Sequence, residues 1–209
     1  HYQLTRDRAF LDRVYPGVVK AMAWLDSVIT QDPCGVFPPA TIADDAYLKD
    51  CRQTGQHLWG LIGVRNAVYM AREMDNAADL ARFEAQEKRF RAAFDKLLDA
   101  QTAKTGGYIP PALERTTAGN DWDNLRTLHP EILFDPADPR IEATLRTVRG
   151  RYQEGVLAYT WPSSIGRQGE QFIFNEQPGL HYWQTPNNAQ VSLVRGTAWD
   201  QECNIFVLF

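Results

Sequence analysis

The chain has 209 residues, 44% of them hydrophobic, which is enough to bury a core in one domain or in part of a larger one. Its 22 Lys and Arg residues are outnumbered by 26 Asp and Glu, and no basic run alternates with aromatics, so nucleic acid is not an expected partner. No apolar run approaches the roughly 20 residues of a membrane-spanning helix, and the start is too charged for a signal peptide. We expect a soluble chain without membrane contact, whose compartment the sequence leaves open.

The first periodic segment, residues 6–30, has apolar residues at the i, i+3, i+4, i+7 spacing of an amphipathic helix. Thr5 is in position to cap its N-terminus. Because proline removes a helical hydrogen bond, Pro16-Gly17 predicts a kink, or a short helix that ends there. The expected inward residues are Leu11, Val14, Tyr15, Val18, Val19, Met22, Leu25 and Ile29.

Two further helices are predicted over residues 54–73 and 76–103, joined by a connection of two or three residues. Gly55, Gly60 and Gly63 in the first of them indicate a close approach by another helix or a ligand, since glycine otherwise disfavours a helix. Asp75 is the expected N-cap of the second.

Asp138-Pro139 predicts an N-cap followed by proline at the first position of a helix over residues 139–153, with Ile141, Leu145, Val148 and Tyr152 inward. A long aromatic connection from residue 158 to about 183 follows, and then an amphipathic segment over 187–195. The chain closes on an apolar run from Ile205 to Phe209.

A short motif occurs twice, at Gly35 and 72 residues later at Gly107, as Gly-Val-Phe-Pro-Pro-Ala and Gly-Tyr-Ile-Pro-Pro-Ala. A repeat at a fixed long period indicates one supersecondary unit used twice, and a Pro-Pro pair belongs in a loop. Carboxylates follow both copies. Since long and short connections alternate along the chain, both Pro-Pro loops are expected at the same end of antiparallel helical hairpins.

The cysteines and histidines give no metal-binding pattern. Cys34, Cys51 and Cys203 are odd in number and widely spaced, and the four histidines include no H-x-x-x-H pair. We expect no metal and no cofactor, and a structural or buried role for each cysteine.

The chain resembles the six-hairpin glycosidases, the (α/α)6 toroids of the glucoamylase, trehalase and rhamnosidase type. The resemblance rests on Pro38-Pro39-Ala40-Thr41-Ile42-Ala43-Asp44-Asp45, on Gly55-Gln56-His57-Leu58-Trp59-Gly60, on Gly119-Asn120-Asp121-Trp122-Asp123 and on Gly179-Leu180-His181-Tyr182-Trp183-Gln184. It implies an all-α fold of antiparallel hairpins forming a toroid. Such a barrel has twelve helices and this chain offers five or six, so we expect a single domain over 1–209 that is an arc of a toroid. One of its catalytic carboxylates could then lie outside the chain, in which case the chain by itself would show little or no hydrolase activity, and the open flanks would favour self-association.

The resemblance implies hydrolysis of an oligosaccharide or glycoside, which needs two carboxyl groups on either side of the scissile bond. Asp45 and Asp121 are the leading candidates for acid and base, with Glu114 as a third. The alternative for any of them is a loop Asp or Glu that bonds local backbone or caps a helix. The corresponding alternative for the protein is a non-catalytic helical scaffold or a glycan- or protein-binding module. A cyclase for isoprenoids or peptides would need metal ligands that the sequence does not offer.

Aromatic and polar side chains near the loops are candidates for stacking on a sugar or bonding to its hydroxyls. For Trp59 and His57, which lie in a predicted helix, a place in the core is the alternative. The candidate substrate-binding residues are Asp44, Tyr47, His57, Trp59, Tyr108, Trp122, Asp123, His181 and Trp183.

Overall fold

The computed structural model describes residues 1–40, 48, 50–114, 124–150, 152–153, 156–159, 179–180 and 185–196. This part of the chain is mainly helical, which confirms the predicted all-α class, and its three strands are only two to four residues long. The toroid stays a prediction. The elements are α1 (Tyr2–Thr5), α2 (Arg8–Gln31), α3 (Thr54–Glu73), α4 (Ala77–Thr102), α5 (Pro139–Arg149), β1 (Tyr152–Gln153), β2 (Val156–Tyr159), β3 (Gly179–Leu180) and α6 (Thr185–Arg195).

The chain divides into two compact units. Unit 1 consists of His1–Pro38 and Gln56–Leu98, and unit 2 consists of Pro39–Gly55 and Asp99–Phe209. Most of α3 and α4 therefore belongs to unit 1, whereas the first two residues of α3 and the last four of α4 belong to unit 2.

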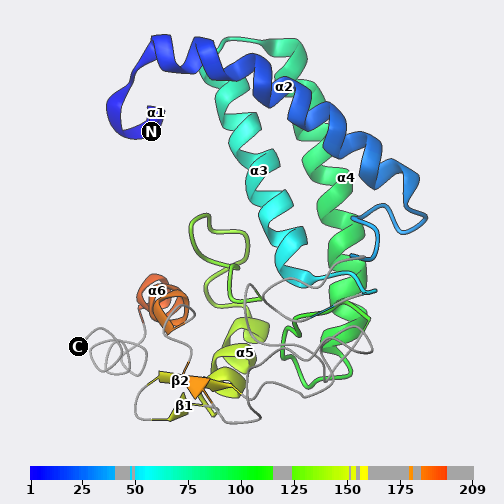
Figure 1. Cartoon of the computed structure of the whole chain (residues 1–209), viewed down its shortest axis with the longest axis vertical. Coiled ribbons are helices and arrows are strands. Elements are labelled where there is room, and N and C mark those ends of the chain that lie inside the picture. Colours follow the sequence, from blue (N-terminus) through cyan, green and yellow to red (C-terminus); the bar gives the residue numbers. More distant parts are fainter. Residues whose placement is uncertain are drawn as a thin grey trace. The chain divides into compact units, whose positions relative to one another are not determined.

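In unit 1, α3 and α4 run antiparallel and α2 lies across them (Figure 1). Polar contacts join α2 to α4 along this crossing: Gln86 donates to the Met22 carbonyl at 3.1 Å, and Arg89 pairs with Asp26 at 2.9 Å. The connection from α3 to α4 is the short one that the sequence predicts.

The core of unit 1 follows the predicted apolar stripes, because residues three or four apart share a helix face. Its buried members include Leu11, Tyr15, Met22, Leu25 and Ile29 of α2, Leu58, Leu61, Ile62 and Val68 of α3, and Phe83, Phe90, Phe94 and Leu98 of α4. Glycine matters at one of the predicted positions: a Cβ on Gly60 would lie 2.6 Å from Phe37 and 2.9 Å from Phe90. An added Cβ on Gly63 would have nothing within 4 Å, so the predicted close approach is wrong at this glycine.

Two predictions for the first helix are wrong, its cap at Thr5 and a helix end at Pro16-Gly17, while a kink there stays a prediction. Asp7, not Thr5, caps α2, since its carboxylate accepts from the Phe10 backbone N–H at 2.9 Å. The helix also runs unbroken through Pro16. Both Pro16 and Gly17 are exposed, so water can bond the carbonyl that the proline leaves without a donor.

The predicted cap of α4 is displaced by one residue. The Asn76 side chain accepts from the Asp79 backbone N–H at 3.0 Å, and α4 begins at the next residue, Ala77. Asp75 instead has a positive φ of 55°, the left-handed conformation that ends many helices. Asp75 therefore closes the turn after α3 and does not start α4.

In unit 2, Asp138 caps α5 and Pro139 is its first residue, as predicted, and the side chain of Asp138 accepts from the Arg140 backbone N–H at 2.8 Å. The helix ends earlier than predicted, at Arg149 with Gly150 as its C-cap, so Tyr152 lies in β1 instead. Strands β1, β2 and β3 form a small antiparallel sheet, with Tyr152 opposite Leu157 and Tyr159 opposite Gly179.

Helix α6 corresponds to the predicted segment 187–195 and is joined to α5 by polar side chains. Arg195 pairs with Glu142 at 2.5 Å, and Arg149 donates to Asn188 at 3.3 Å and to Ser192. Three of the predicted inward residues of α5, Ile141, Leu145 and Val148, are buried.

The cysteines behave differently from one another. Cys51 is buried as expected, but Cys34 is exposed, so the predicted buried role is wrong for it, and Cys203 lies outside the described residues. Among the helices that the structure describes, none is long and apolar enough to cross a membrane.

Candidate functional site

The two copies of the Pro-Pro motif open with the same backbone geometry. Gly35 and Gly107 have positive φ angles of 70° and 95°, which favour glycine. Each is also close to one alanine side chain: an added Cβ would lie 3.3 Å from Ala93 at Gly35 and 3.2 Å from Ala143 at Gly107. The repeat in the sequence is therefore a repeat in local structure.

Within unit 2, residues 50–54 pair with Ala40, the last residue of the first Pro-Pro motif, and with the second Pro-Pro loop. On one side Ala40 donates to the Cys51 carbonyl at 2.9 Å, and on the other Leu113 donates to the Arg52 carbonyl at 2.8 Å. Successive residues of an extended chain direct their backbone groups to opposite sides, so one short segment can pair with both loops. Antiparallel bridges join Ala40 to Cys51 and Gln53 to Ala112. Within unit 2, residues 50–54 thus connect Ala40, at the end of the first motif, to the second Pro-Pro loop, and the predicted placement of both loops at one end of the hairpins stays a prediction.

The second Pro-Pro loop is fixed through its carbonyl groups. Prolines cannot donate, and a buried carbonyl without a partner is costly, so the loop needs donors from elsewhere. Thr54 supplies two of them: its hydroxyl donates to the Pro110 carbonyl at 2.6 Å and its backbone N–H to the Pro111 carbonyl at 2.8 Å. Asn124 donates to the Ile109 carbonyl at 2.8 Å, and Gln101 to the Leu113 carbonyl.

Apolar side chains fill the space between the paired segments. Leu48 and Cys51 from the first loop cluster with Ala112 from the second, and each is at most 1% exposed. On the other side of the second loop, the Ile109 backbone N–H donates to the Thr144 hydroxyl of α5 at 2.9 Å. The second Pro-Pro loop is therefore part of the core of unit 2, together with Leu48 and Cys51, whereas Pro38 and Pro39 of the first are exposed.

An ion pair crosses between the two loops. The carboxylate of Glu114 accepts from the Arg52 backbone N–H at 2.7 Å through one oxygen and from the Arg52 guanidinium at 2.6 Å through the other. The guanidinium side chain is only 14% exposed, compared with 38% for the carboxylate. No local sequence pattern singles out Arg52, because only the pairing of residues 50–54 with the second loop brings it opposite Glu114.

Most of the candidate site residues lie outside the part of the chain that the structure describes. Glu114, Tyr108, His57 and Trp59 are described. The candidates outside it are Asp44, Asp45, Tyr47, Asp121, Trp122, Asp123, His181 and Trp183.

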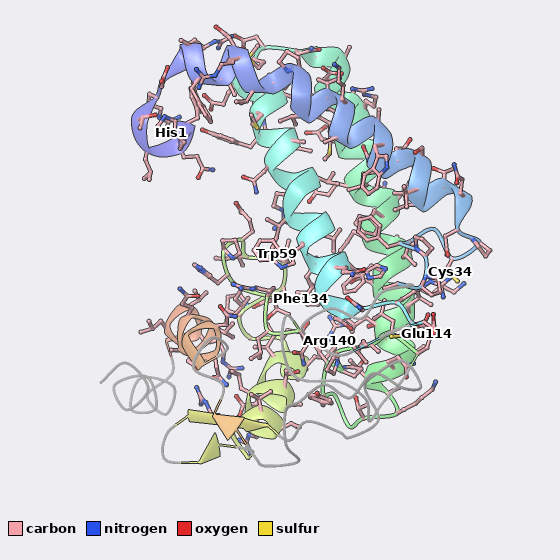
Figure 2. All side chains as sticks on the ribbon, viewed as in Figure 1. His1, Cys34, Trp59, Glu114, Phe134 and Arg140 are labelled. Carbon is pink, nitrogen blue, oxygen red and sulfur yellow. The ribbon has the colours of Figure 1, made fainter. Side chains whose placement is uncertain are left out.

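His57 and Trp59 have different environments on α3 of unit 1. The His57 ring is fully buried, stacked on Phe94 with 5.8 Å between ring centroids and edge-on to Phe37 at 5.4 Å. We therefore assign His57 to the packing of unit 1 and leave it out of the sugar site. The Trp59 indole is 42% exposed, which leaves surface for stacking (Figure 2).

Tyr108 belongs to the second Pro-Pro loop of unit 2, where it is buried. Its backbone carbonyl accepts from the Thr105 hydroxyl, which anchors the start of the loop. A buried tyrosine offers little ring surface to a sugar, so its contribution here is to loop packing.

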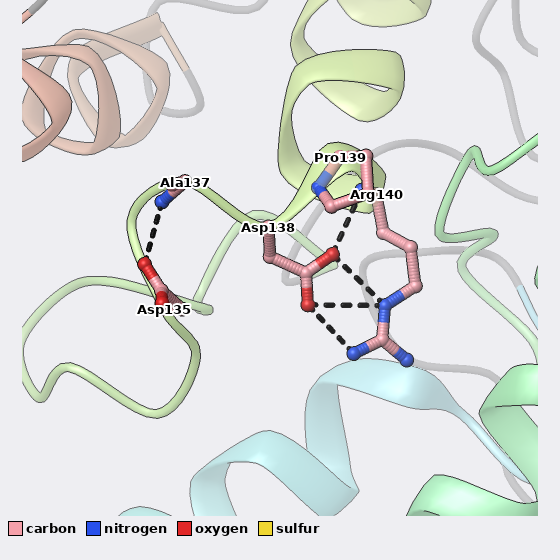
Figure 3. A pocket seen from close by; sticks show the side chains of 5 residues that line it. All are labelled: Asp135, Ala137, Asp138, Pro139 and Arg140. Carbon is pink, nitrogen blue, oxygen red and sulfur yellow. Dashed lines mark hydrogen bonds and ion pairs between the residues drawn. The ribbon is translucent and has the colours of Figure 1, made fainter.

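A hollow of about 450 Å³ lies at the start of α5 in unit 2 (Figure 3). Two carboxylates line it, and each accepts hydrogen bonds from neighbouring protein groups. Asp135 accepts from the Ala137 backbone N–H at 2.8 Å, and Asp138 is held by Arg140, whose guanidinium lies 2.7 Å away and 5.1 Å from the centroid of Phe134. These carboxylates act as turn and helix caps.

No three His, Cys, Asp or Glu side chains gather as metal ligands would among the described residues. No known protein family matches the sequence, and no curated protein is similar to it.

Proposed function

We propose that this protein is a glycoside hydrolase of the six-hairpin type, which cleaves an oligosaccharide or glycoside with two carboxylates as acid and base. The supporting observation is the pairing of residues 50–54 with both Pro-Pro loops. Asp45 precedes this pairing by a few residues, and Asp121 follows it. Glycoside hydrolysis needs two carboxyl groups that a rigid scaffold holds a fixed distance apart, and two chain segments paired within one unit can supply such a scaffold.

Asp45 and Asp121 are the proposed acid and base. A general acid must release a proton to the leaving oxygen, whereas Glu114 already accepts two hydrogen bonds from Arg52. We therefore place Glu114 in a supporting role. Asp44 and Asp123, next to the leading pair, are proposed to bond substrate hydroxyls.

Aromatic side chains are proposed to bind the sugar by stacking on its CH faces. Trp59 supports this with its partly exposed indole, which leaves ring surface for such stacking. The remaining proposed contacts are Tyr47, Trp122, His181 and Trp183.

Turnover of aryl glycosides and oligosaccharides by the full chain tests the proposal. Asp45→Asn and Asp121→Asn are each expected to lower kcat by about 10²- to 10⁴-fold, the usual contribution of an acid or base. Arg146→Met is the matched control, because it removes an exposed partner of Glu142 on α5. Turnover that survives both asparagine variants removes these two residues from the mechanism and leaves the reaction class open.

A non-catalytic module that binds a glycan or a protein is the second candidate. It is favoured by the engagement of the carboxylates of Glu114, Asp135 and Asp138 with protein donors. Titration calorimetry with the same oligosaccharides separates the two: heat of binding without product supports the module, and product supports the enzyme. The self-association expected from the sequence stays a prediction that sedimentation velocity tests.

A further inference from the structure

Helix α2 has a second apolar stripe beside the one that it buries. Its members follow one another at intervals of four and three residues in alternation, so they share one face of the helix. Each lies one position before a residue of the stripe that faces the core of unit 1. The residues of this second stripe are Phe10, Val14, Gly17, Ala21, Trp24 and Val28.

The centre of the second stripe is open to solvent. Trp24 is 63% exposed, and Gly17 and Ala21 are exposed as well. A Cβ added to Gly17 would have nothing within 4 Å. The two valines of the stripe are half-buried, and at its beginning the Phe10 ring lies edge-on to His1 with 4.5 Å between ring centroids. The open part therefore extends from Gly17 to Trp24.

The spacing and the sizes of these residues favour a helix as the occupant. Alternating intervals of three and four residues are the pattern of a coiled-coil seam, into which a second helix fits its own apolar residues. Gly17 and Ala21 are small, so another helix backbone can come close at the centre of the stripe, with Val14 on one side and Trp24 on the other. A lipid surface would instead be met by bulky apolar residues at the centre.

Basic side chains border the second stripe on the side away from the core. Arg13 and Lys20 are both exposed, and neither forms an ion pair with a described carboxylate. The Arg13 guanidinium lies over the Phe10 ring, 5.6 Å from its centroid. Other arginines of unit 1 do pair with carboxylates, among them Arg8, Arg82, Arg89 and Arg91. In a chain with a net charge of −4, this border is a local positive region that favours an acidic partner.

We propose that this face of α2 binds an amphipathic helix of a partner protein, whose apolar seam is bordered by Asp or Glu. The stripe supplies the apolar contact, and Arg13 and Lys20 select the charge of the partner. A second copy of the chain is a poorer match, because antiparallel pairing of the stripe with itself would bring the Lys20 side chains of the two copies together. The inference does not depend on the proposed glycosidase function, since none of these residues belongs to the proposed site.

Titration calorimetry of the full chain with two designed peptides tests the proposal. Both peptides have about four heptads with Leu at a and d, and one has Glu and the other Lys at e and g, which keeps each from pairing with itself. The Glu peptide is expected to bind about threefold or more tighter than the Lys peptide, and the double variant Arg13→Glu/Lys20→Glu should reverse this order.

Two exposed alanines of α2 provide a matched pair of variants. Ala21→Glu places a charge in the stripe and should weaken binding of the Glu peptide about tenfold or more, because a buried charge without a partner is costly. Ala23→Glu adds the same charge outside the stripe and should change the affinity less than about twofold. Circular dichroism checks that both variants keep the helical content of the wild type.

Four outcomes would overturn the proposal. The first is absence of binding of the Glu peptide to the wild type, and the second is an equal loss of affinity in Ala21→Glu and Ala23→Glu. The third is a dimer in sedimentation velocity that Ala21→Glu dissociates, which would make a second copy the occupant. The fourth is binding to phosphatidylcholine vesicles with about 20% phosphatidylserine that Trp24→Ala abolishes, which would make the stripe a membrane-binding surface.

Discussion

The phenol of Tyr15 on α2 donates a hydrogen bond to the carboxylate of Asp79 on α4, with 2.9 Å between the oxygens. Tyr15 is almost completely buried, so water cannot take the place of the deleted hydroxyl without a cost in free energy. Tyr15→Phe is expected to lower the free energy of unfolding by about 1–2 kcal/mol. Urea denaturation at neutral pH measures this.

The same contact makes the stability of unit 1 depend on pH in the alkaline range. Burial, and then the bond to Asp79, raise the pKa of Tyr15 to about 12. The folded state holds this proton more tightly than the unfolded chain, whose tyrosine titrates near 10. The stabilisation is thus complete below about pH 10 and is lost as the pH rises toward 12. A difference between wild type and Tyr15→Phe that stays constant from pH 9 to 12 would contradict this. Tyr69→Phe is the control, because the half-buried Tyr69 bonds to Arg6 and not to Asp79.

Gly60→Ala is expected to destabilise the protein by about 1–3 kcal/mol, the usual cost of overpacking. The reason is the 2.6 Å that separates the new Cβ from Phe37. Gly63→Ala on the same helix is the matched control: it meets nothing within 4 Å and should stabilise by up to about 1 kcal/mol through helix propensity. Thermal unfolding of both variants measures the difference in stability. Equal stabilities of the two variants would mean that Phe37 moves aside freely.

Asn76→Ala is expected to cost about 1 kcal/mol, because the α4 N-terminus loses the side chain that accepts from the Asp79 backbone N–H. Asp75→Gly should be neutral or stabilising, since Asp75 has a positive φ that glycine adopts more readily. Chemical denaturation of the two variants compares them directly. A larger loss for Asp75→Gly would restore Asp75 as the cap.

His129 makes the stability of unit 2 depend on pH in the acidic range. Burial, with repulsion from Arg126, lowers the pKa of His129. The folded state therefore binds this proton less readily than the unfolded chain, where histidine titrates near 6.5. The stabilisation that neutral His129 contributes to the folded state is complete above about pH 6.5 and is lost as the pH falls below it.

The test for His129 compares the unfolding free energy of wild type and His129→Gln at about pH 7.5 and pH 5. The wild type should lose more on acidification than the variant. A His129 proton resonance that titrates in the folded protein at or above its midpoint in urea would rule the effect out.

Local signals in the sequence determined the helices well. The bounds of α3, Thr54–Glu73, equal the predicted 54–73, and α5 begins at Asp138-Pro139 as predicted. Caps and apolar stripes depend on residues at most four positions apart, so the sequence contains them completely. Errors of one or two residues, as at Asn76 and Asp7, arise where two residues close in sequence are both suited to cap the same helix.

The sequence also predicted the local repeat. Gly35 and Gly107 have the same left-handed backbone conformation, and each lies close to an alanine of a helix. Individual roles were harder to predict. His57 and Tyr108 are buried, and the leading carboxylates Asp45 and Asp121 are predictions that no described residue tests.

Only the tertiary structure decided which distant residues meet. Nothing in the sequence distinguishes Gly60 from Gly63, because the difference is the ring of Phe37 brought in from another segment. Nor does it pair Arg52 with Glu114, since a shift of one residue in the register of the loops would turn one of the two side chains away. Long-range register is set by the packing of the whole core, which local patterns do not encode.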